Sequence, residues 1–175
     1  MALIWCDGIL PPMKILTILT LGAALATFTS SVQADATITL TGVHNCCGGC
    51  ADGIEEAITQ AGATADIDDS TVKITAKTEA DVKKATDALV AAGYFGEGAS
   101  APEVEDAQVK SAKVGGVHLC CGKCVKAVEK AVKSVKGATS HTAKKNSDTF
   151  SVEGDFSTKE LAAALNKAGF SGRIQ

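Results

Sequence analysis

The sequence predicts an α+β protein made of two tandem copies of one βαββαβ unit. Three observations carry this prediction: a cysteine motif that occurs twice, an apolar period that alternates between strand and helix spacing within each copy, and an acidic stretch between the copies. Of the 175 residues, 46% are hydrophobic but only 4% are aromatic. The length allows two small domains, whose cores must consist mainly of Ala, Val, Ile and Leu.

The repeat is clearest in two short stretches, GVHNCCGGC at 42–50 and GVHLCCGKC at 116–124, which lie 74 positions apart. Further along, the offset becomes 76, where AAG before Tyr94 matches KAG before Phe170. Two extra residues near KKNSD in the second copy account for this change. Internal repetition of this kind indicates that one structural unit occurs twice.

The first copy opens with ATITLTGV at 36–43, in which Ile38 and Leu40 alternate as in a strand. After the motif, apolar residues at helical spacing predict a helix that ends at Gly62. Two short alternating runs follow, ATADID and TVKITAK, and the DS between them predicts a hairpin. A second helix ends at Gly93, because glycine suits a left-handed C-terminal cap, and a short last strand follows.

The second copy repeats this order, with helices that end at Gly137 and Gly169 and a hairpin of TSHTAKK and TFSVEG split by NSD. The order βαββαβ is the split βαβ arrangement of ferredoxin-like domains. We therefore predict two ferredoxin-like domains, the first copy at 36–98 and the second copy at 109–175. The acidic residues 99–108 between them are expected to form a flexible linker.

We expect residues 1–34 to be removed as an upstream extension and signal peptide. MKILTILTLGAALATFTSSVQA at 13–34 has one lysine, an apolar run of about 14 residues and a polar stretch that ends at Ala34. The run is shorter than the roughly 20 residues that a membrane span needs. Translation is expected to start at Met13 rather than Met1. The mature chain is then periplasmic or secreted, with no membrane attachment after cleavage.

Six cysteines remain in the mature chain: Cys46, Cys47, Cys50, Cys120, Cys121 and Cys124. The predicted order places them between the first strand and the first helix of each copy, with Cys50 and Cys124 on the first helical turn. Unpaired N–H groups and the positive end of the helix dipole favour thiolate there, which predicts lowered pKa values for these cysteines. A thiolate binds soft metals or attacks disulfides, and the spacing alone leaves both open.

The motifs and the helices after them, GVHNCCGGCADGIEEAI and GVHLCCGKCVKAVEKAV, resemble the metal-binding loop and first helix of heavy-metal-associated domains. This is the family of copper chaperones and metal-ATPase N-terminal modules. The resemblance implies a βαββαβ fold and one soft-metal site per domain. It implies that Cys47 and Cys50 form one ligand pair, and Cys121 and Cys124 the other. A metal-transporting ATPase or another metal acceptor is the partner that it implies.

The chain departs from the family pattern, which has a methionine before the cysteine pair. Here an extra cysteine, Cys46 or Cys120, precedes each pair, and His44 or His118 stands two positions earlier. Two thiolates suit Cu(I), whereas three thiolates and an imidazole suit tetrahedral Zn²⁺. We predict Cu(I), with Zn²⁺ as the alternative. The extra cysteines and the histidines are candidate ligands, and packing of the loop is the other role open to the histidines.

The alternative function is thiol–disulfide exchange by the Cys-x-x-Cys pairs, since an exported compartment permits disulfides. Purely structural disulfides are less favoured, because so short a loop restrains little of the unfolded chain. The sequence shows no Ser-His-Asp set, paired carboxylates or phosphate-binding loop, and we do not expect an enzyme. We predict an exported protein that sequesters or relays a soft metal.

The net charge of −3 hides an asymmetry between the copies. Residues 35–98 hold 7 Asp and 4 Glu against 4 Lys, which gives −7, whereas residues 109–175 hold 11 Lys and 1 Arg against 2 Asp and 3 Glu, which gives +7. Opposite charges favour association, so we expect the two domains to associate within the chain and bring their loops face to face. Nucleic acid is not an expected partner of an exported chain with so few aromatic residues.

Overall fold

The computed structural model describes residues 34–175, and the rest of the predicted signal peptide lies outside them. Gln33–Gln175 forms one compact unit with two antiparallel sheets and four helices among its described residues. The predicted α+β class is confirmed, whereas the predicted domain and linker boundaries stay predictions. None of the helices in the described part of the chain is long and apolar enough to cross a membrane.

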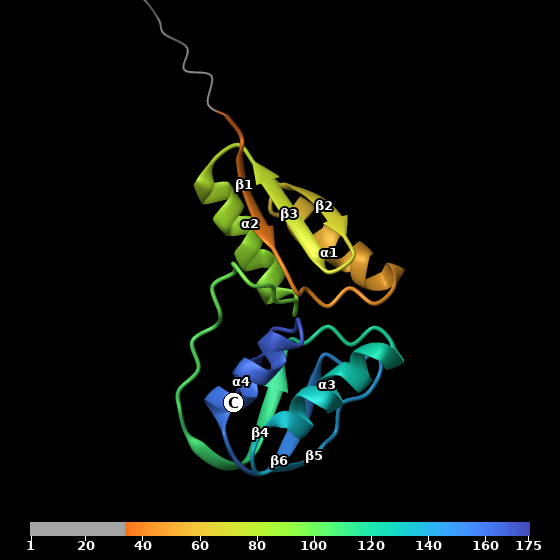
Figure 1. Cartoon of the computed structure of the whole chain (residues 1–175), viewed down its shortest axis with the longest axis vertical. Coiled ribbons are helices and arrows are strands. Elements are labelled where there is room, and N and C mark those ends of the chain that lie inside the picture. Colours follow the sequence, from red (N-terminus) through yellow and green to blue (C-terminus); the bar gives the residue numbers. More distant parts are fainter. Residues whose placement is uncertain (1–33) are drawn as a thin grey trace, which may run out of the picture. The chain divides into compact units, whose positions relative to one another are not determined.

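The elements of the first copy are β1 (Ala36–Leu40), α1 (Gly48–Gln60), β2 (Thr64–Asp68), β3 (Thr71–Ala76) and α2 (Glu79–Ala91). The strands pair antiparallel, with β3 between β1 and β2 (Figure 1). On β3, Val72 and Ile74 are fully buried while Lys73 is exposed. One face of the sheet therefore packs against α1 and α2 and the other is polar, as is common in antiparallel sheets.

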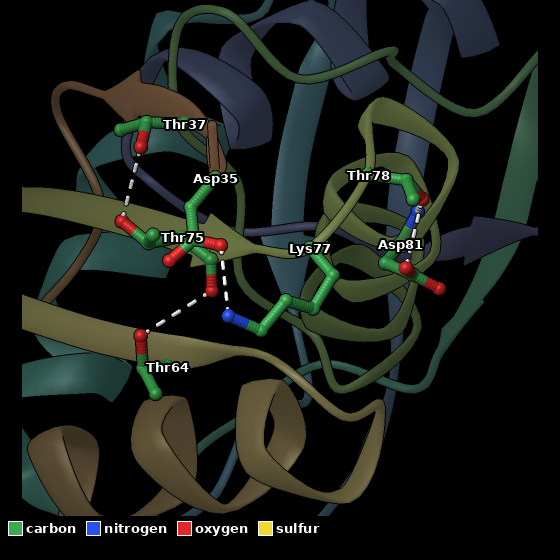
Figure 2. Close-up of polar contacts among 7 residues, drawn as sticks. All are labelled: Asp35, Thr37, Thr64, Thr75, Lys77, Thr78 and Asp81. Atoms are coloured by element: carbon green, nitrogen blue, oxygen red, sulfur yellow. Dashed lines mark hydrogen bonds and ion pairs between the residues drawn. The ribbon is translucent and has the colours of Figure 1, made fainter. Parts of the chain in front are cut away.

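Side-chain hydrogen bonds define the start of α2 and the edge of this sheet (Figure 2). The Thr78 hydroxyl accepts a hydrogen bond from the backbone N–H of Asp81 at 3.1 Å, which caps the helix. Such a cap stabilises a helix by about 1 kcal/mol. The hydroxyls of Thr37 and Thr75 lie 3.1 Å apart across β1 and β3. The predicted hairpin and second helix of this copy thus form as expected from local sequence.

The elements of the second copy are β4 (Gln108–Gly115), α3 (Gly122–Ser134), β5 (Ala138–His141), β6 (Thr149–Ser157), α4 (Thr158–Lys167) and β7 (Arg173–Ile174). The strand order is β5-β6-β4-β7. Phe150, Val152 and Phe156 on β6 are buried in the core. Helices α3 and α4 contact each other and strands of this sheet, so this copy shows the full predicted βαββαβ order.

The predicted last strand of the first copy is reduced to a single bridge. Thr41 and Glu97 exchange both backbone hydrogen bonds, at 3.2 and 2.8 Å, and pairing stops there. The next residue, Gly98, has a φ of +104°, which turns the chain out of the extended conformation that a strand requires. In the second copy, Arg173 and Ile174 continue the pairing as β7.

Candidate metal centre

Both cysteine motifs lie where a strand leads into a helix. Cys47 and Cys121 are the N-cap residues of α1 and α3, with extended backbones, and Cys50 and Cys124 lie in the first helical turns. This is the placement that the sequence predicts. The sulfurs are therefore near the ends of both helices where backbone N–H groups lack partners and the dipole is positive.

The sulfurs of both loops gather in one place, named here the thiol cluster. Its members are Cys46, Cys47, Cys50, Cys120, Cys121 and Cys124. Cys46 contacts the other copy closely, with its sulfur 3.5 Å from that of Cys121 and 3.7 Å from that of Cys124. Its distance to Cys50 in its own loop is 3.8 Å. The cysteine that the family pattern lacks thus lies between the two loops.

Cys120, in the second loop, makes the contacts equivalent to those of Cys46. Its sulfur lies 3.6 Å from that of Cys47 and 3.5 Å from that of Cys50. The extra cysteine of each loop therefore contacts the Cys-x-x-Cys pair of the other loop. The two pairs meet at Cys50 and Cys124, whose sulfurs are 3.9 Å apart and whose side chains are fully buried. Through these contacts, the sulfurs of the two loops form one continuous cluster.

His44 extends this set on one side. Its ring and the sulfurs of Cys46, Cys50 and Cys124 offer four candidate ligand atoms within 4.8 Å of one another. The sequence predicts a Cys₃His set from a single loop, but this group takes its third cysteine from the other copy. Within residues 34–175, His118 joins no comparable group of candidate ligands.

Each motif histidine stacks on an aromatic ring of the other copy. His44 lies on Phe170 with ring centroids 4.3 Å apart, and His118 lies on Tyr94 at 4.7 Å. Both Nε2 atoms are buried, with no hydrogen-bond partner among the described residues. Burial lowers the pKa of both histidines, and the nearby His118 lowers that of His44 further. Both rings are therefore neutral near pH 7 and pack as aromatic groups between the copies.

The cysteines differ in their acidity. A hydrogen bond from the backbone of Cys124 lowers the pKa of Cys121 to about 6. Burial opposes ionisation of Cys50, but hydrogen bonds from the Cys46 backbone and from neighbouring thiols outweigh it, and the pKa of Cys50 is lowered. Burial raises the pKa of Cys46, Cys120 and Cys124. The prediction of a lowered pKa is therefore correct for Cys50 and wrong for Cys124. At Cys124 the effect of burial on the pKa outweighs the effect of the helix terminus.

Backbone contacts bring the copies together next to the cluster. The N–H of Phe95 donates to the carbonyl of Gly169, and the N–H of Ser171 donates to the carbonyl of Gly93, both at 3.0 Å. These segments follow α2 and α4 and form equivalent, reciprocal pairs. The two copies thus dock through the ends of their second helices.

Gly93 and Gly169 permit this close approach. They have φ values of +94° and +85°, which favour glycine. A Cβ on Gly93 would lie 2.5 Å from the carbonyl oxygen of Gly116 and 2.5 Å from the backbone N of His118, and a Cβ on Gly169 would meet the backbone N of His44. The sequence predicts these glycines only as helix caps. Both glycines occur at the same place in the repeat, in AAG and KAG. This repetition is the feature of the sequence that could have indicated their role in the contact between the copies.

Charged side chains contribute little directly to this docking. The Nζ of Lys123 donates to the carbonyl of Cys46 at 3.3 Å, which joins α3 to the first loop. The ion pairs found among residues 34–175 all lie within one copy. The copies contact each other through backbone, aromatic and sulfur atoms, and attraction by their opposite net charges stays a prediction.

Comparison with known proteins supports the resemblance seen in the motif. The family model of the heavy-metal-associated domain matches residues 113–171, in the second copy alone. The resemblance is thereby confirmed for these residues, and heavy-metal binding is the function that the match supports. No curated protein matches the chain.

One solved structure shows a likeness, the solution structure of the N-terminal soluble domains of Bacillus subtilis CopA. The two are 18% identical, and the alignment covers 82% of this chain and 96% of that chain with a TM-score of 0.31. A likeness at this score carries no weight for the fold or function of this chain.

We predict that Gly169→Ala loosens the thiol cluster, whereas Gly62→Ala does not. Both glycines have positive φ, at +85° and +90°, so alanine costs about 1–2 kcal/mol of backbone strain at either position. A Cβ on Gly62 meets no atom within 4 Å, but on Gly169 it displaces the backbone of His44. Alkylation of Cys50 by iodoacetamide, read by peptide mass spectrometry, should accelerate in Gly169→Ala only. Equal rates in the two variants would show that the glycine contact does not hold the loops.

We also predict that Cys121 is the most reactive thiol of the folded, metal-free chain near neutral pH. Its pKa of about 6 means that its thiolate fraction rises as the pH passes through 6 and falls by about tenfold for each unit below that. Cys46 and Cys120, whose pKa values are raised, should react slowly at pH 7. In denaturant all six should react alike, as thiols with a pKa of about 8.5 do. A Cys121 that reacts only above pH 8 in the folded chain contradicts this prediction.

Proposed function

We propose that the protein binds Cu(I) in one site shared by its two loops, and sequesters or relays the metal outside the cytoplasm. The observation that carries the proposal is the reach of each extra cysteine to the Cys-x-x-Cys pair of the other loop, at sulfur–sulfur distances of 3.5–3.7 Å. Sites made of thiolates select soft metals. The family match of residues 113–171 supports metal binding independently.

Zn²⁺ is the alternative, and it would use a different part of the site. Structural Zn²⁺ takes four tetrahedral ligands, and the group of His44 with Cys46, Cys50 and Cys124 offers such a set. Zn²⁺ there would leave three cysteines of the cluster without a metal. Cu(I) is satisfied by two or three thiolates and can use all six, which favours Cu(I).

The chain itself prepares two of its cysteines, Cys50 and Cys121, for a cation, because their pKa values are lowered. The N-termini of α1 and α3 both stabilise thiolates, and Cys121 is already largely ionised at pH 7 because its pKa is about 6. Cys47 is exposed while Cys50 and Cys124 are buried. An incoming metal can therefore bind first at Cys47 and pass to the buried sulfurs by exchange of thiolate ligands. Burial there excludes water and competing ligands, as sequestration requires.

Thiol–disulfide exchange by the Cys-x-x-Cys pairs is less favoured. The sulfur of Cys47 lies 3.9 Å from that of Cys50 but 3.6 Å from that of Cys120. Oxidation would thus not select the Cys-x-x-Cys pair, and several disulfides would compete within the cluster. A redox protein needs one defined pair, whereas a metal site benefits from the whole set. Metal binding, rather than catalysis, is the proposed role.

We propose further that the mature chain delivers its metal to a metal-transporting ATPase or another acceptor in the periplasm or outside the cell. The signal-peptide pattern and the family match support this part. Mass spectrometry of the protein purified from its own cells should show a mature chain that begins near Asp35. A chain that retains Met1 or Met13 in the cytoplasmic fraction would contradict export.

The shared site is tested by removing the cysteines of one loop at a time. A Cys120→Ser/Cys121→Ser/Cys124→Ser variant and the matched Cys46→Ser/Cys47→Ser/Cys50→Ser variant are titrated with Cu(I) against a chromophoric chelator, without oxygen. We expect each variant to hold Cu(I) at least tenfold more weakly than the full chain, because the remaining loop keeps only its own sulfurs. Half of the copper bound at unchanged affinity in both variants would indicate two independent sites.

A further inference from the structure

The geometry of the thiol cluster points to a tetranuclear Cu(I)–thiolate cluster, with four Cu(I) ions and six bridging cysteines in each chain. This inference rests on the proposed binding of Cu(I) and adds how many ions the site takes and how the sulfurs share them. The grouping of the sulfurs carries it.

Four groups of three sulfurs between them use every sulfur of the cluster, and in each group all sulfurs lie within 4.8 Å of one another. The groups are Cys46, Cys50 and Cys124; Cys46, Cys47 and Cys121; Cys47, Cys50 and Cys120; and Cys120, Cys121 and Cys124. Every sulfur belongs to two of the four groups. Three of the groups draw on both loops, and one lies within the second loop. No single loop accounts for the pattern.

The grouping has the connectivity of an octahedron. Three pairs of sulfurs share no group: Cys46 and Cys120, Cys47 and Cys124, and Cys50 and Cys121. These pairs correspond to the opposite corners of an octahedron, and the four groups are one of its two sets of alternate faces. The faces between them are equally compact, since the sulfurs of Cys46, Cys121 and Cys124 lie 3.5–3.7 Å apart. Cations on neighbouring faces would share two sulfurs and repel each other, so we infer that one alternate set alone is occupied. Any two of these faces share one corner and no edge. A cation on each face would therefore share one sulfur with each of the other three.

Occupation of one set of alternate faces gives a definite stoichiometry. One Cu(I) on each face has three thiolate ligands, and each thiolate bridges two ions, so four ions use all six sulfurs and none is left over. With a metal–sulfur bond of about 2.3 Å, as for Zn²⁺ thiolates, a trigonal site has sulfurs about 4.0 Å apart. Nine sulfur pairs of the cluster lie at 3.5–3.9 Å. The cage thus has nearly the size that the ions need.

The charge balance is also met. Four Cu(I) ions and six thiolates give a cluster with a net charge of −2. The cysteines that are still protonated release their protons to solvent, with no change in oxidation state. Two helix N-termini, each equivalent to about half a positive charge, lie at the cluster. The Nζ of Lys123 donates to the carbonyl of Cys46 beside it. These groups stabilise the excess negative charge.

The stoichiometry separates this arrangement from its alternatives. Independent loops with one Cys-x-x-Cys pair each would bind two Cu(I) per chain and would not need Cys46 or Cys120. A single shared ion would give one per chain, and Zn²⁺ on the His44 group would also give one.

The experiment is an oxygen-free titration of the reduced full chain with Cu(I), supplied as its acetonitrile complex and followed by native mass spectrometry. We expect saturation at four copper ions per chain, with short copper–copper distances in X-ray absorption and the emission typical of shielded Cu(I)–thiolate clusters. Saturation at one ion overturns the cluster but leaves the proposed shared Cu(I) site intact, whereas saturation at two ions, one in each loop, overturns the cluster and the shared site. A chain that binds no Cu(I) overturns both.

Single substitutions test the bridging role. Cys46→Ser and Cys120→Ser each remove a sulfur from two faces, so both variants should hold fewer than four Cu(I) and lose the same number. Asn45→Ala is the matched control, because it changes the same loop without removing a sulfur, and it should keep four. Circular dichroism checks that each variant is folded. Four ions in Cys46→Ser would overturn the bridging role of Cys46.

Discussion

The close approach of the two copies at Gly93 and Gly169 is the constraint on which the metal site depends. Without a Cβ at these positions, the backbone of each cysteine motif lies directly against the end of a helix in the other copy. The stacking of His44 on Phe170 and the contacts among the sulfurs follow from that approach. A Cβ at either glycine would meet backbone atoms of the motif in the other copy, so the two backbones would have to move apart. The site is therefore a product of docking as much as of the motif.

Metal binding and docking must consequently stabilise each other. Each copy has a small core made mainly of aliphatic residues, and buried thiols such as Cys50 and Cys124 contribute only as small apolar groups while they are protonated. Metal ions bound across both loops would link the copies directly. If the docked arrangement binds the proposed metal more tightly than separated loops do, each tenfold difference in affinity favours docking by about 1.4 kcal/mol.

Local signals in the sequence predict most of the fold. The hairpins and the helix ends at glycines depend on a few neighbouring residues and form as expected. The last strand of the first copy fails because Gly98 takes a positive φ, which the composition permits but does not specify. The raised pKa of Cys124 could not be predicted from its helix, since part of its burial comes from the other copy. The pairing of sulfurs across 70 or more positions likewise depends on docking alone.

The departures from the family pattern and the docking of the copies explain each other. A loop that works alone needs two thiolates, and an extra cysteine beside them would only invite oxidation. Once two loops face each other, Cys46 and Cys120 are the residues that reach across, each to the pair of the other loop. The motif histidines, His44 and His118, have a related role, because their neutral rings stack on aromatic residues of the other copy and fill the space between the copies. The third cysteine and the histidine of each motif are thus expected together, as parts of one site built from two copies.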